Sequence, residues 1–344
     1  MNSSPYTIAV VIPNWNGSQY LPDMLDSIIA QTFQDWRCYI VDDQSTDNSL
    51  EILKEYHGKD ERICYSVRDR LPKGAQTCRN IGLELSVGAE YLIWFDSDDL
   101  IAPYCFEQRV AFMEAHQDLD FGVFPAKSFS NDIWELDGSS LFGFKYFSES
   151  DLCRFLRRKL PFVGWTNIYR RSSLVKNEMI WDDQLLSLQD SDFNIQSILK
   201  GLKYGYDNGG RIDYFWRVKP SSGSISTKIF SKGHQTSHIY FLNKLHETIP
   251  VKVQKKYSLD LDDYLFFFID KFFTEKEFVS QVLDQKWLNG RYMFKARIRL
   301  YCYLGKWSKK FLFPLLNTYR RGYNQKISKA NKVELQKSIL ISKS

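Results

Sequence analysis

The sequence predicts an α/β fold, a doubly wound and mainly parallel sheet flanked by helices, followed by a helical C-terminal region. Two observations lead to this fold class. Up to residue 125, apolar runs rich in β-branched residues alternate with stretches in which apolar residues recur at helical spacing. This alternation is typical of parallel sheets, because each crossover helix covers a face of the sheet. From residue 231 onward, the pattern is helical.

Each predicted strand of the first half is an apolar run that ends in polar or turn-forming residues. The predicted strands cover residues 7–12, 36–41, 63–67 and 91–95, with helices around 21–29, 50–53 and 75–88. The second half is less regular. Its predicted elements are a helix over 151–160, a strand over 163–169, a turn over 170–172, a helix from 189, and strands over 205–208 and 213–218.

Polar side chains follow three of these strands: Asn14 after the first, Asp42 after the second and Asp96 after the fourth. Because the carboxyl ends of parallel strands meet at one edge of a sheet, we expect a single nucleotide-binding site there. The chain has neither a Gly-x-Gly-x-x-Gly motif after the first strand nor a Gly-x-x-x-x-Gly-Lys-Ser/Thr motif. Phosphates would therefore be bound mainly by a metal and by basic residues.

Three carboxylates follow the fourth strand. Asp96, Ser97 and Asp98 form an Asp-x-Asp motif, and Asp99 comes directly after it. Carboxylates packed so closely repel one another unless a cation lies among them. Hard oxygen ligands suit Mg²⁺ or Mn²⁺ bound together with substrate phosphates, so we expect a divalent metal cofactor. The alternative is an acidic turn that caps the next helix, a role that Asp99 could fill alone.

Five motifs, in this order and spacing, are similar to those of one protein family. They are Pro-Asn-Trp-Asn at 13–16, Gln-Thr-Phe at 31–33, Asp-Asp-Gln-Ser-Thr-Asp at 42–47, Cys-Arg-Asn-Ile-Gly at 78–82 and Asp-Ser-Asp-Asp at 96–99. The chain resembles the family-two inverting glycosyltransferases of the bacterial surface-polysaccharide type, which have the GT-A fold. The resemblance covers about residues 5–228. It continues less tightly in Gln189-Asp190, Trp216-Arg217 and Ser222-Gly223-Ser224.

The resemblance implies a domain organisation and a reaction. Residues 1–228 would form the GT-A domain, with a nucleotide-sugar-binding half over 7–125 and an acceptor-binding half over 126–228, followed by a basic, aromatic-rich helical region over 229–344. The reaction implied is inverting transfer of a sugar from a nucleotide-sugar donor, a UDP-sugar, to a saccharide or a polyprenyl-linked saccharide. The alternatives are a nucleotide- or nucleic-acid-binding protein with an inactive sheet domain, and a nucleotidyltransferase with the same metal geometry. We expect no nucleic acid partner.

The resemblance also implies roles for individual residues. The nucleotide sugar would be bound by Pro13, Asn14, Trp15, Asn16, Asp43, Lys73, Arg79, Asp96 and Ser97, and the metal by Asp96, Asp98 and Asp99. Trp15 would stack on the base and Asp43 would accept its imide N–H. Lys73 and Arg79 would face the diphosphate. Two alternatives stay open: Trp15 could pack only against the sheet edge, and Arg79 could pair with a structural acid.

Asp190 is the candidate catalytic base. Inversion needs one carboxylate to remove the proton of the acceptor hydroxyl as that hydroxyl attacks the anomeric carbon. The alternative is that Asp190 caps its helix. The chain departs from the family pattern at two positions. Gln189 replaces the family's Glu, and Gln44 replaces a Gly, so we expect a different turn after Asp43.

The net charge of +5 hides a division between an acidic body and a basic tail. Residues 286–344 contain fifteen Lys and Arg and one acid, a net charge of +14, which leaves −9 for residues 1–285. Aromatic residues lie among these cations. With a glycosyltransferase upstream, we expect residues 286–337 to contact an anionic membrane. The alternative is a helical extension whose aromatic residues complete the core.

We expect a cytoplasmic protein, peripheral to the inner face of the plasma membrane. Residues 1–7 lack the pattern of a signal peptide, and no run of eighteen apolar residues is found. Six cysteines are scattered without Cys-x-x-Cys spacing, as in proteins with reduced thiols. His234 and His238 have i, i+4 spacing, but the sequence offers no third metal ligand beside them, so we expect them on a solvated helix face.

Overall fold

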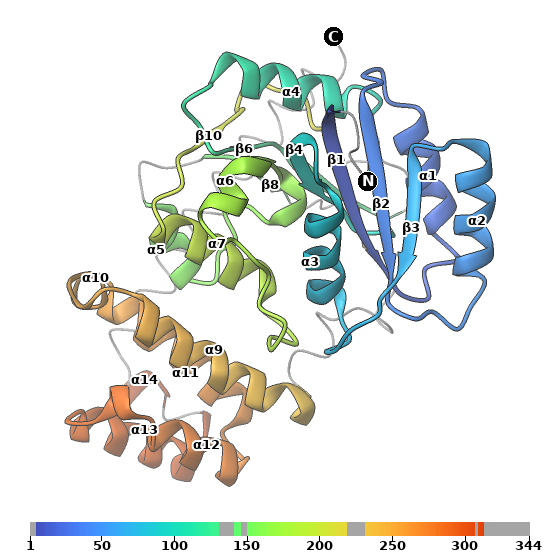
Figure 1. Ribbon diagram of the computed structural model, residues 1–344. Helices are drawn as coiled ribbons and strands as arrows, with labels where there is room; N and C mark the ends of the chain where they lie inside the picture. Colours follow the sequence, from blue (N-terminus) through green and yellow to red (C-terminus); the bar gives the residue numbers. More distant parts are fainter. Residues whose placement is uncertain (1–4, 131–140, 146–149, 219–230, 307–308, 313–344) are drawn as a thin grey trace. The chain divides into compact units, whose positions relative to one another are not determined.

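A computed structural model describes residues 5–130, 141–145, 150–218, 231–306 and 309–312 (Figure 1). The chain divides into two compact units. The first, here called the sheet unit, contains Met1–Phe147, Leu160–Gln184 and Gln189–Pro220. The second, the helical unit, contains Ser148–Lys159, Leu185–Leu188 and Ser221–Ser344. The expected boundary at residue 228 stays a prediction, and the stretch 222–224 lies outside the described residues.

The sheet unit is built on a seven-stranded sheet in the order β10-β6-β9-β4-β1-β2-β3 (Figure 1). Its strands are β1 Tyr6–Asn14, β2 Trp36–Asp42, β3 Ile63–Val67, β4 Ala89–Trp94, β6 Phe121–Val123, β9 Asn167–Arg170 and β10 Tyr204–Tyr206. β9 runs antiparallel to β4 and β6, and the other described pairs are parallel. The predicted mainly parallel, doubly wound sheet is confirmed.

The register of the strands brings the predicted site residues to one edge. Asn14 at the end of β1 pairs with Asp42 at the end of β2, and Val11 of β1 pairs with Trp94, the last residue of β4. Because β1 lies between β2 and β4 and runs parallel to both, the loops that follow all three strands leave the sheet at the same edge.

A second sheet of four strands was not predicted. Its order is β5-β11-β7-β8, with β5 at Leu100–Ile101, β11 at Tyr214–Arg217, β7 at Ala126–Phe129 and β8 at Leu141–Phe142. Of its strands, β11 lies within the strand predicted over 213–218, which is confirmed. β5, β7 and β8 were not predicted, because runs of two to four residues show little periodicity. β5 comes directly after the Asp-x-Asp motif and pairs antiparallel with β11. β11, which is more than a hundred residues further along the chain, therefore holds the end of the Asp-x-Asp loop.

Helices flank the seven-stranded sheet (Figure 1). They are α1 Leu21–Ile29, α2 Ser49–Lys59, α3 Ala75–Leu85, α4 Cys105–Ala115, α6 Arg171–Lys176 and α7 Gln189–Leu199, with a 3-10 helix at Gly164–Thr166. α3 lies so close to β1 that a Cβ at Gly82 would be 2.1 Å from Cγ1 of Val11. Glycine, which has no Cβ, permits this approach. The turn predicted over 170–172 is wrong: Arg171 begins α6, which the buried Leu174 anchors in the core. Helix α4 was not predicted.

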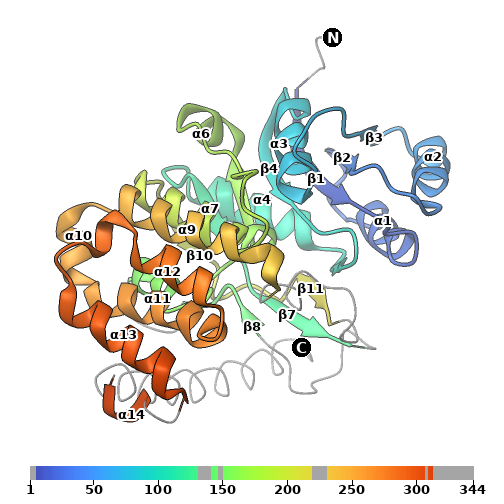
Figure 2. The ribbon, with the colours of Figure 1, turned by 90° about the horizontal axis from the view of Figure 1, so that it is seen from below.

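The helical unit contains α5 at Asp151–Leu156, shorter than predicted (Figure 1), and the C-terminal helices (Figure 2). These are a 3-10 helix at Lys232–His234, α9 Gln235–Thr248, α10 Val251–Lys256, α11 Ser258–Phe272, α12 Lys276–Leu283, a 3-10 helix at Lys286–Leu288, α13 Tyr292–Leu304 and α14 Lys309–Leu312. The helical C-terminal region is confirmed for the described residues. Among the helices described here, none has the length and apolar character to cross a membrane.

His238 was expected on a solvated helix face, and this expectation is wrong. Its side chain in α9 is fully buried, and its ring stacks on Phe268 with the ring centroids 4.3 Å apart. Nε2 lies 3.2 Å from Oγ of Ser187. Burial lowers the pKa of His238 to about 4, so the imidazole is neutral at pH 7 and belongs to the core of the helical unit.

Candidate active site

The end of β1 is fixed to the end of β2 by hydrogen bonds between neutral and acidic side chains. Nδ2 of the buried Asn14 donates to Oδ2 of Asp42 at 2.7 Å. The other oxygen of Asp42 accepts the backbone N–H of Ser45 at 2.7 Å, and Oγ of Ser45 accepts the backbone N–H of Asn16 at 2.8 Å. Pro13 is buried within β1. These contacts hold the loop after β1 in one conformation.

Trp15 and Lys73 are exposed members of the predicted site. The Trp15 side chain is 60% exposed, so it does not pack only against the sheet edge, and its ring is open to stacking by a flat ligand. Ser97, after β4, adjoins the same loop, because its Oγ is 3.3 Å from the position that a Cβ of Gly17 would take. Lys73 lies on the surface just ahead of α3. The nucleotide-binding roles of these residues stay predictions.

Asp43 is paired with a cation that the motifs did not reveal. Nε of the buried Arg68 donates to Oδ1 of Asp43, and the backbone N–H of Asp43 donates to the carbonyl of Asn14 at 2.7 Å. Arg68 directly follows β3, so its position at the sheet edge could have been predicted from the sequence. The next residue, Gln44, has a φ of 60°, the left-handed conformation that favours glycine. Gln44 therefore adopts a conformation that glycine adopts easily, and the different turn expected from this substitution stays a prediction.

Arg79 of α3 is the centre of a cluster of charged side chains. Its Nη2 donates to Oδ1 of Asp96 at 2.7 Å, its Nη1 lies 3.5 Å from Oε1 of Gln189, and its guanidinium lies 4.5 Å from the centroid of the Trp181 ring. Burial lowers the pKa of Arg79, but Asp96 and Asp190 outweigh this effect and raise it. Arg79 thus pairs with an acid, as in the alternative above, and that acid is itself a predicted site residue.

The Asp-x-Asp loop is held by β11. Asp99 is 1% exposed, its Oδ2 accepts the phenol O–H of Tyr214 at 2.5 Å, and its Oδ1 accepts the backbone N–H of Arg217 at 2.8 Å. The backbone N–H of Asp96 donates to Oη of Tyr214 at 3.3 Å. Nε of Arg217 donates to the carbonyl of Asp98 at 2.8 Å. Both carboxylate oxygens of Asp99 therefore accept hydrogen bonds from the protein.

This arrangement leaves Asp96 and Asp98 as the stronger candidates for metal ligands. Burial raises the pKa of Asp96 against the effect of Arg79, and the charge of Asp98 raises it further, a repulsion that a cation would relieve. Within the described ranges, no three His, Cys, Asp or Glu side chains are grouped to hold a metal. Two carboxylates suit Mg²⁺ or Mn²⁺ that completes its coordination with phosphate and water. A metal contact from Asp99 stays a prediction.

Asp190, the second residue of α7, reaches the same cluster. Its Oδ1 accepts the backbone N–H of Gly164 at 2.8 Å, which orients the carboxylate. Asp190 is close enough to Arg79 and Asp96 to raise the pKa of both. It lies inside the helix rather than at the cap position, so capping does not account for its orientation. The structure thus brings Arg79, Asp96 and Asp190 together.

Three residues that the sequence analysis did not single out support this cluster. Nε2 of Gln189 donates to Oε1 of Gln76 at 3.1 Å, which ties α7 to α3. Nδ2 of Asn80 donates to the carbonyl of Trp181 at 2.8 Å, and the backbone N–H of Trp181 donates to Oδ1 of Asn80 at 2.9 Å. The Cys-Arg-Asn-Ile-Gly motif contains Asn80 and was a signal for it. Trp181 lies outside every motif.

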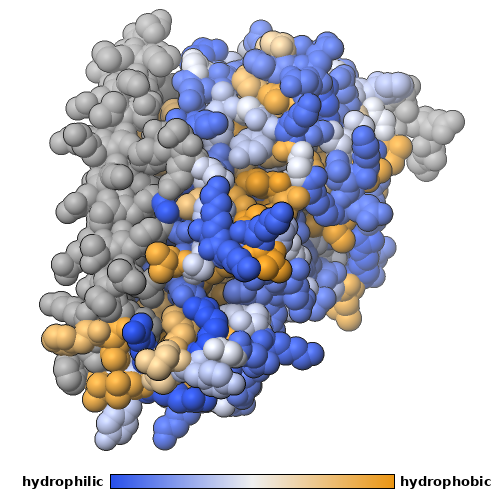
Figure 3. Space-filling view, turned by 90° about the vertical axis from the view of Figure 1, so that its left-hand side faces the viewer, coloured by the Kyte–Doolittle hydropathy of each residue, from blue (hydrophilic) through white to orange (hydrophobic). Residues whose placement is uncertain are grey.

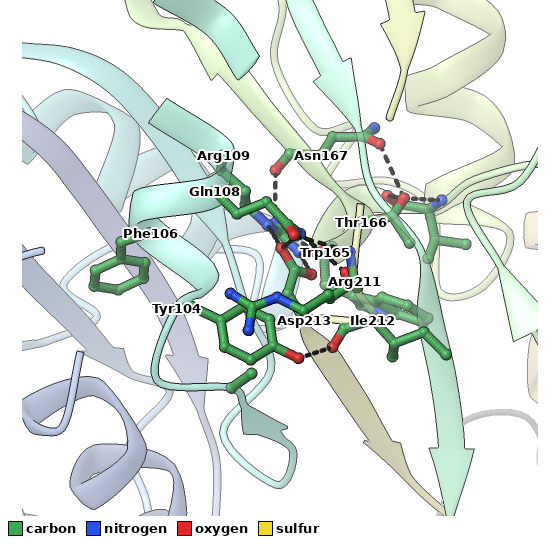
Figure 4. Close-up of polar contacts among 12 residues, drawn as sticks. Tyr104, Phe106, Gln108, Arg109, Trp165, Thr166, Asn167, Arg211, Ile212 and Asp213 are labelled. Atoms are coloured by element: carbon green, nitrogen blue, oxygen red, sulfur yellow. Dashed lines mark hydrogen bonds and ion pairs between the residues drawn. The ribbon is translucent and has the colours of Figure 1, made fainter. Parts of the chain in front are cut away.

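A buried ion pair underlies the start of β11 (Figure 4). Arg109 of α4 and Asp213 are both fully buried, and Nε and Nη2 of Arg109 donate to the two carboxylate oxygens of Asp213 at 2.9 and 2.8 Å. Nη1 of Arg109 also donates to the carbonyl of Trp165 at 3.1 Å. The ring of Trp165 stacks on Tyr214 with centroids 4.7 Å apart. This network fixes Tyr214, and through it Asp99 and the backbone of Asp96.

Comparison with known proteins assigns this site to a family. The sequence model of Glycosyl transferase family 2 matches residues 9–178. This range contains β2, β3, β4 and the part of β1 that leads to the site edge. Residues 9–178 are a glycosyltransferase family 2 domain. The alternatives of an inactive nucleic-acid-binding protein and of a nucleotidyltransferase receive no support.

Two curated relatives share the glycosyltransferase domain. An uncharacterized glycosyltransferase of Methanocaldococcus jannaschii is 28% identical over 294 residues, which cover 81% of this chain and 94% of the relative. The poly(ribitol-phosphate) beta-glucosyltransferase of Bacillus spizizenii is 26% identical over 223 residues, 64% of this chain. The chain spans only 33% of the length of the Bacillus enzyme.

A solved structure shares the fold of the glycosyltransferase. The crystal structure of S. aureus TarS 1–349, in complex with UDP-GlcNAc, has a TM-score of 0.57 at 19% identity and covers 86% of this chain and 81% of that chain. At this identity the likeness shows the fold. The expected GT-A glycosyltransferase fold is therefore confirmed.

Proposed function

We propose that this glycosyltransferase works with inversion, moving a sugar from a nucleotide-sugar donor to a saccharide or polyprenyl-linked saccharide acceptor. The observation that carries the proposal is the cluster of Arg79, Asp96 and Asp190 at the carboxyl edge of the sheet. It sets an oriented carboxylate beside the residues suited to a donor diphosphate.

In the proposed reaction, Asp190 acts as the general base. The Gly164 N–H holds Oδ1, so Oδ2 would receive the proton of the acceptor hydroxyl. As that hydroxyl forms its bond to the anomeric carbon, the bond to the diphosphate breaks on the opposite face, and the nucleoside diphosphate leaves with the electron pair. Arg79 would lie close to the charge that grows on the leaving group, while Trp15 and Asp43 bind the base.

Asp96 and Asp98 would hold Mg²⁺ or Mn²⁺, whose charge would stabilise the leaving diphosphate. We further propose a UDP-sugar donor and an acceptor that belongs to cell-surface polysaccharide synthesis. This choice is supported by the UDP-GlcNAc complex of TarS and by the name of the Bacillus spizizenii relative. A cytoplasmic site of action is supported by six cysteines that are all free thiols.

The proposal is tested by substituting the base and a matched carboxylate. UDP-sugars are first screened for hydrolysis or transfer with Mn²⁺ or Mg²⁺. Asp190→Asn keeps an oxygen for the Gly164 N–H but removes the base, so turnover should fall about a hundredfold or more, with donor affinity unchanged. Asp183→Asn, which changes a partly buried carboxylate outside the cluster, should leave turnover unchanged. Near-wild-type turnover of Asp190→Asn would assign the base to another group.

A further inference from the structure

Helix α13, Tyr292–Leu304, has one face anchored in the helical unit. Ile298 and Tyr301 are fully buried. The ring of Tyr301 meets Phe266 edge to face with centroids 5.0 Å apart, and its hydroxyl donates to Oδ1 of Asp270 on α11. These contacts fix the rotation of α13 about its axis and therefore determine which residues point away from the unit.

The opposite face of α13 is apolar and open. Tyr292, Met293 and Tyr303 are 80%, 73% and 86% exposed, and Leu300 is 44% exposed. At 3.6 residues per turn, these four side chains and the exposed Ala296 fall within an arc of about 100°, opposite the buried pair. Figure 3 shows one side of the molecule, where apolar residues in orange reach the surface among hydrophilic residues in blue. We call the five residues Tyr292, Met293, Ala296, Leu300 and Tyr303 the outer face of α13.

Cations flank the outer face on both edges. By the same helical geometry, Arg297 lies along one edge, and Lys295 and Arg299 lie along the other. The sequence from Lys286 to Val333 contains no Asp or Glu, so no acidic residue of this stretch offsets these charges. An exposed apolar stripe between two rows of cations is the pattern of a helix that lies in the interface of a membrane.

We propose that the outer face of α13 binds the surface of an anionic lipid bilayer, with the helix axis parallel to the membrane. The apolar side chains would enter the boundary between headgroups and acyl chains, and Lys295, Arg297 and Arg299 would contact the lipid phosphates. This inference does not depend on the proposed reaction. It narrows the region expected to contact the membrane, 286–337, to one helix; residues 313–337 of that region lie outside the described residues.

Charge favours lipid over the other possible occupants. Residues 313–344 contain seven Lys and Arg and one acid, so their like charge opposes their docking between the cations of α13. A second copy of the chain in a symmetric pair would bring the same cations face to face. Nucleic acid would satisfy the cations but would leave Met293 and Leu300 against water or phosphate.

The test is sedimentation of the full chain with vesicles of phosphatidylcholine alone or with about 30% phosphatidylglycerol. The protein should pellet with the anionic vesicles and be released by salt, because the attraction is screened. Leu300→Glu should weaken binding about tenfold or more, since it places a charge in the apolar stripe. Leu259→Glu is the matched control, at 45% exposure on α11, and should bind as the wild type does. Arg297→Gln should weaken binding about fivefold.

Three outcomes would overturn the proposal. The first is equal behaviour of the Leu300→Glu and Leu259→Glu proteins toward anionic vesicles. The second is no vesicle binding together with a dimer, or an oligonucleotide complex, that Leu300→Glu abolishes. The third is no vesicle binding together with a lower melting temperature for Leu300→Glu alone, which would show that the chain itself covers this face.

Discussion

The two sides of the sheet edge hold their side chains in different ways. On the β1–β2 side, residues 13–16 and 42–45, the buried carboxylate of Asp42 accepts bonds from Asn14 and Ser45 and Asp43 is paired with Arg68. Trp15 on this side is open to solvent. On the β4–β11 side, residues 96–99 and 214–217, the partly exposed Asp96 faces the buried Arg79, and the buried Asp99 faces Tyr214 and the backbone of β11. An uncharged base needs an open flat surface, whereas fixed charges act most strongly where water is excluded. The two sides should therefore respond differently to substitution.

The largest effect is expected from the ion pair beneath the β4–β11 side. Arg109→Met leaves Asp213 buried without its cation and should lower the free energy of unfolding by about 3–5 kcal/mol in urea denaturation. Arg70 makes the same two-bond contact with Glu84, but at the surface, and is the control. Arg70→Met should cost less than about 1 kcal/mol. Equal losses would mean that burial does not distinguish these pairs.

Substitutions of the neighbouring Asp98 and Asp99 should have different effects, one on metal binding and the other on stability. Asp99→Asn mismatches the buried bonds from Tyr214 and Arg217 and should lower stability by about 1–3 kcal/mol. Asp98→Asn should leave the melting temperature nearly unchanged and remove the dependence of UDP binding on Mn²⁺, measured by calorimetry with and without chelator. The reverse pattern would make Asp99 the metal ligand.

On the β1–β2 side, Trp15→Ala should reduce binding without unfolding. Loss of a stacked base costs about 1–3 kcal/mol, so UDP affinity should fall about tenfold while the melting temperature stays constant. Trp15→Phe should keep most of the affinity. A lower melting temperature with unchanged affinity would assign Trp15 to packing.

The smallest effect concerns the turn on the β1–β2 side. Gln44→Gly should stabilise the protein by about 1 kcal/mol, because a left-handed residue with a side chain is strained. Gln44→Ala keeps that strain and should give no gain. The melting temperatures of the two variants test this prediction. A higher melting temperature for Gln44→Ala would show that the left-handed backbone is not the source of strain.

Local sequence patterns predicted the parts of the fold that local physics determines. Strands β1, β2 and β4 are apolar runs with polar ends, so both their existence and the shared edge of Asn14, Asp42 and Asp96 followed from the sequence. The short strand β3 was also predicted. β5, β7 and β8 were missed because their two to four residues show little periodicity. β9 and β11, of four residues each, were found because they overlap longer predicted strands.

Partners distant in sequence were not predictable in the same way. Asp99 looks like its neighbours Asp96 and Asp98 in sequence, and only its contact with Tyr214 gives it a different environment. The Arg109–Asp213 pair joins residues outside all motifs. For Arg79, the sequence left open whether it meets a phosphate or an acid, and the structure gives it Asp96.

The position of β11 between β5 and β7 also has a consequence for the order in which the protein matures on the ribosome. Tyr214 and Asp99 are 115 residues apart, so the Asp-x-Asp loop cannot take its final form until β11 has been synthesised. The family 2 match ends at residue 178, before this strand. A nascent chain that has formed β1 to β4 therefore still lacks the partner that buries Asp99. A chain that ends or is cleaved before β11 would keep these strands without the final form of the Asp-x-Asp loop.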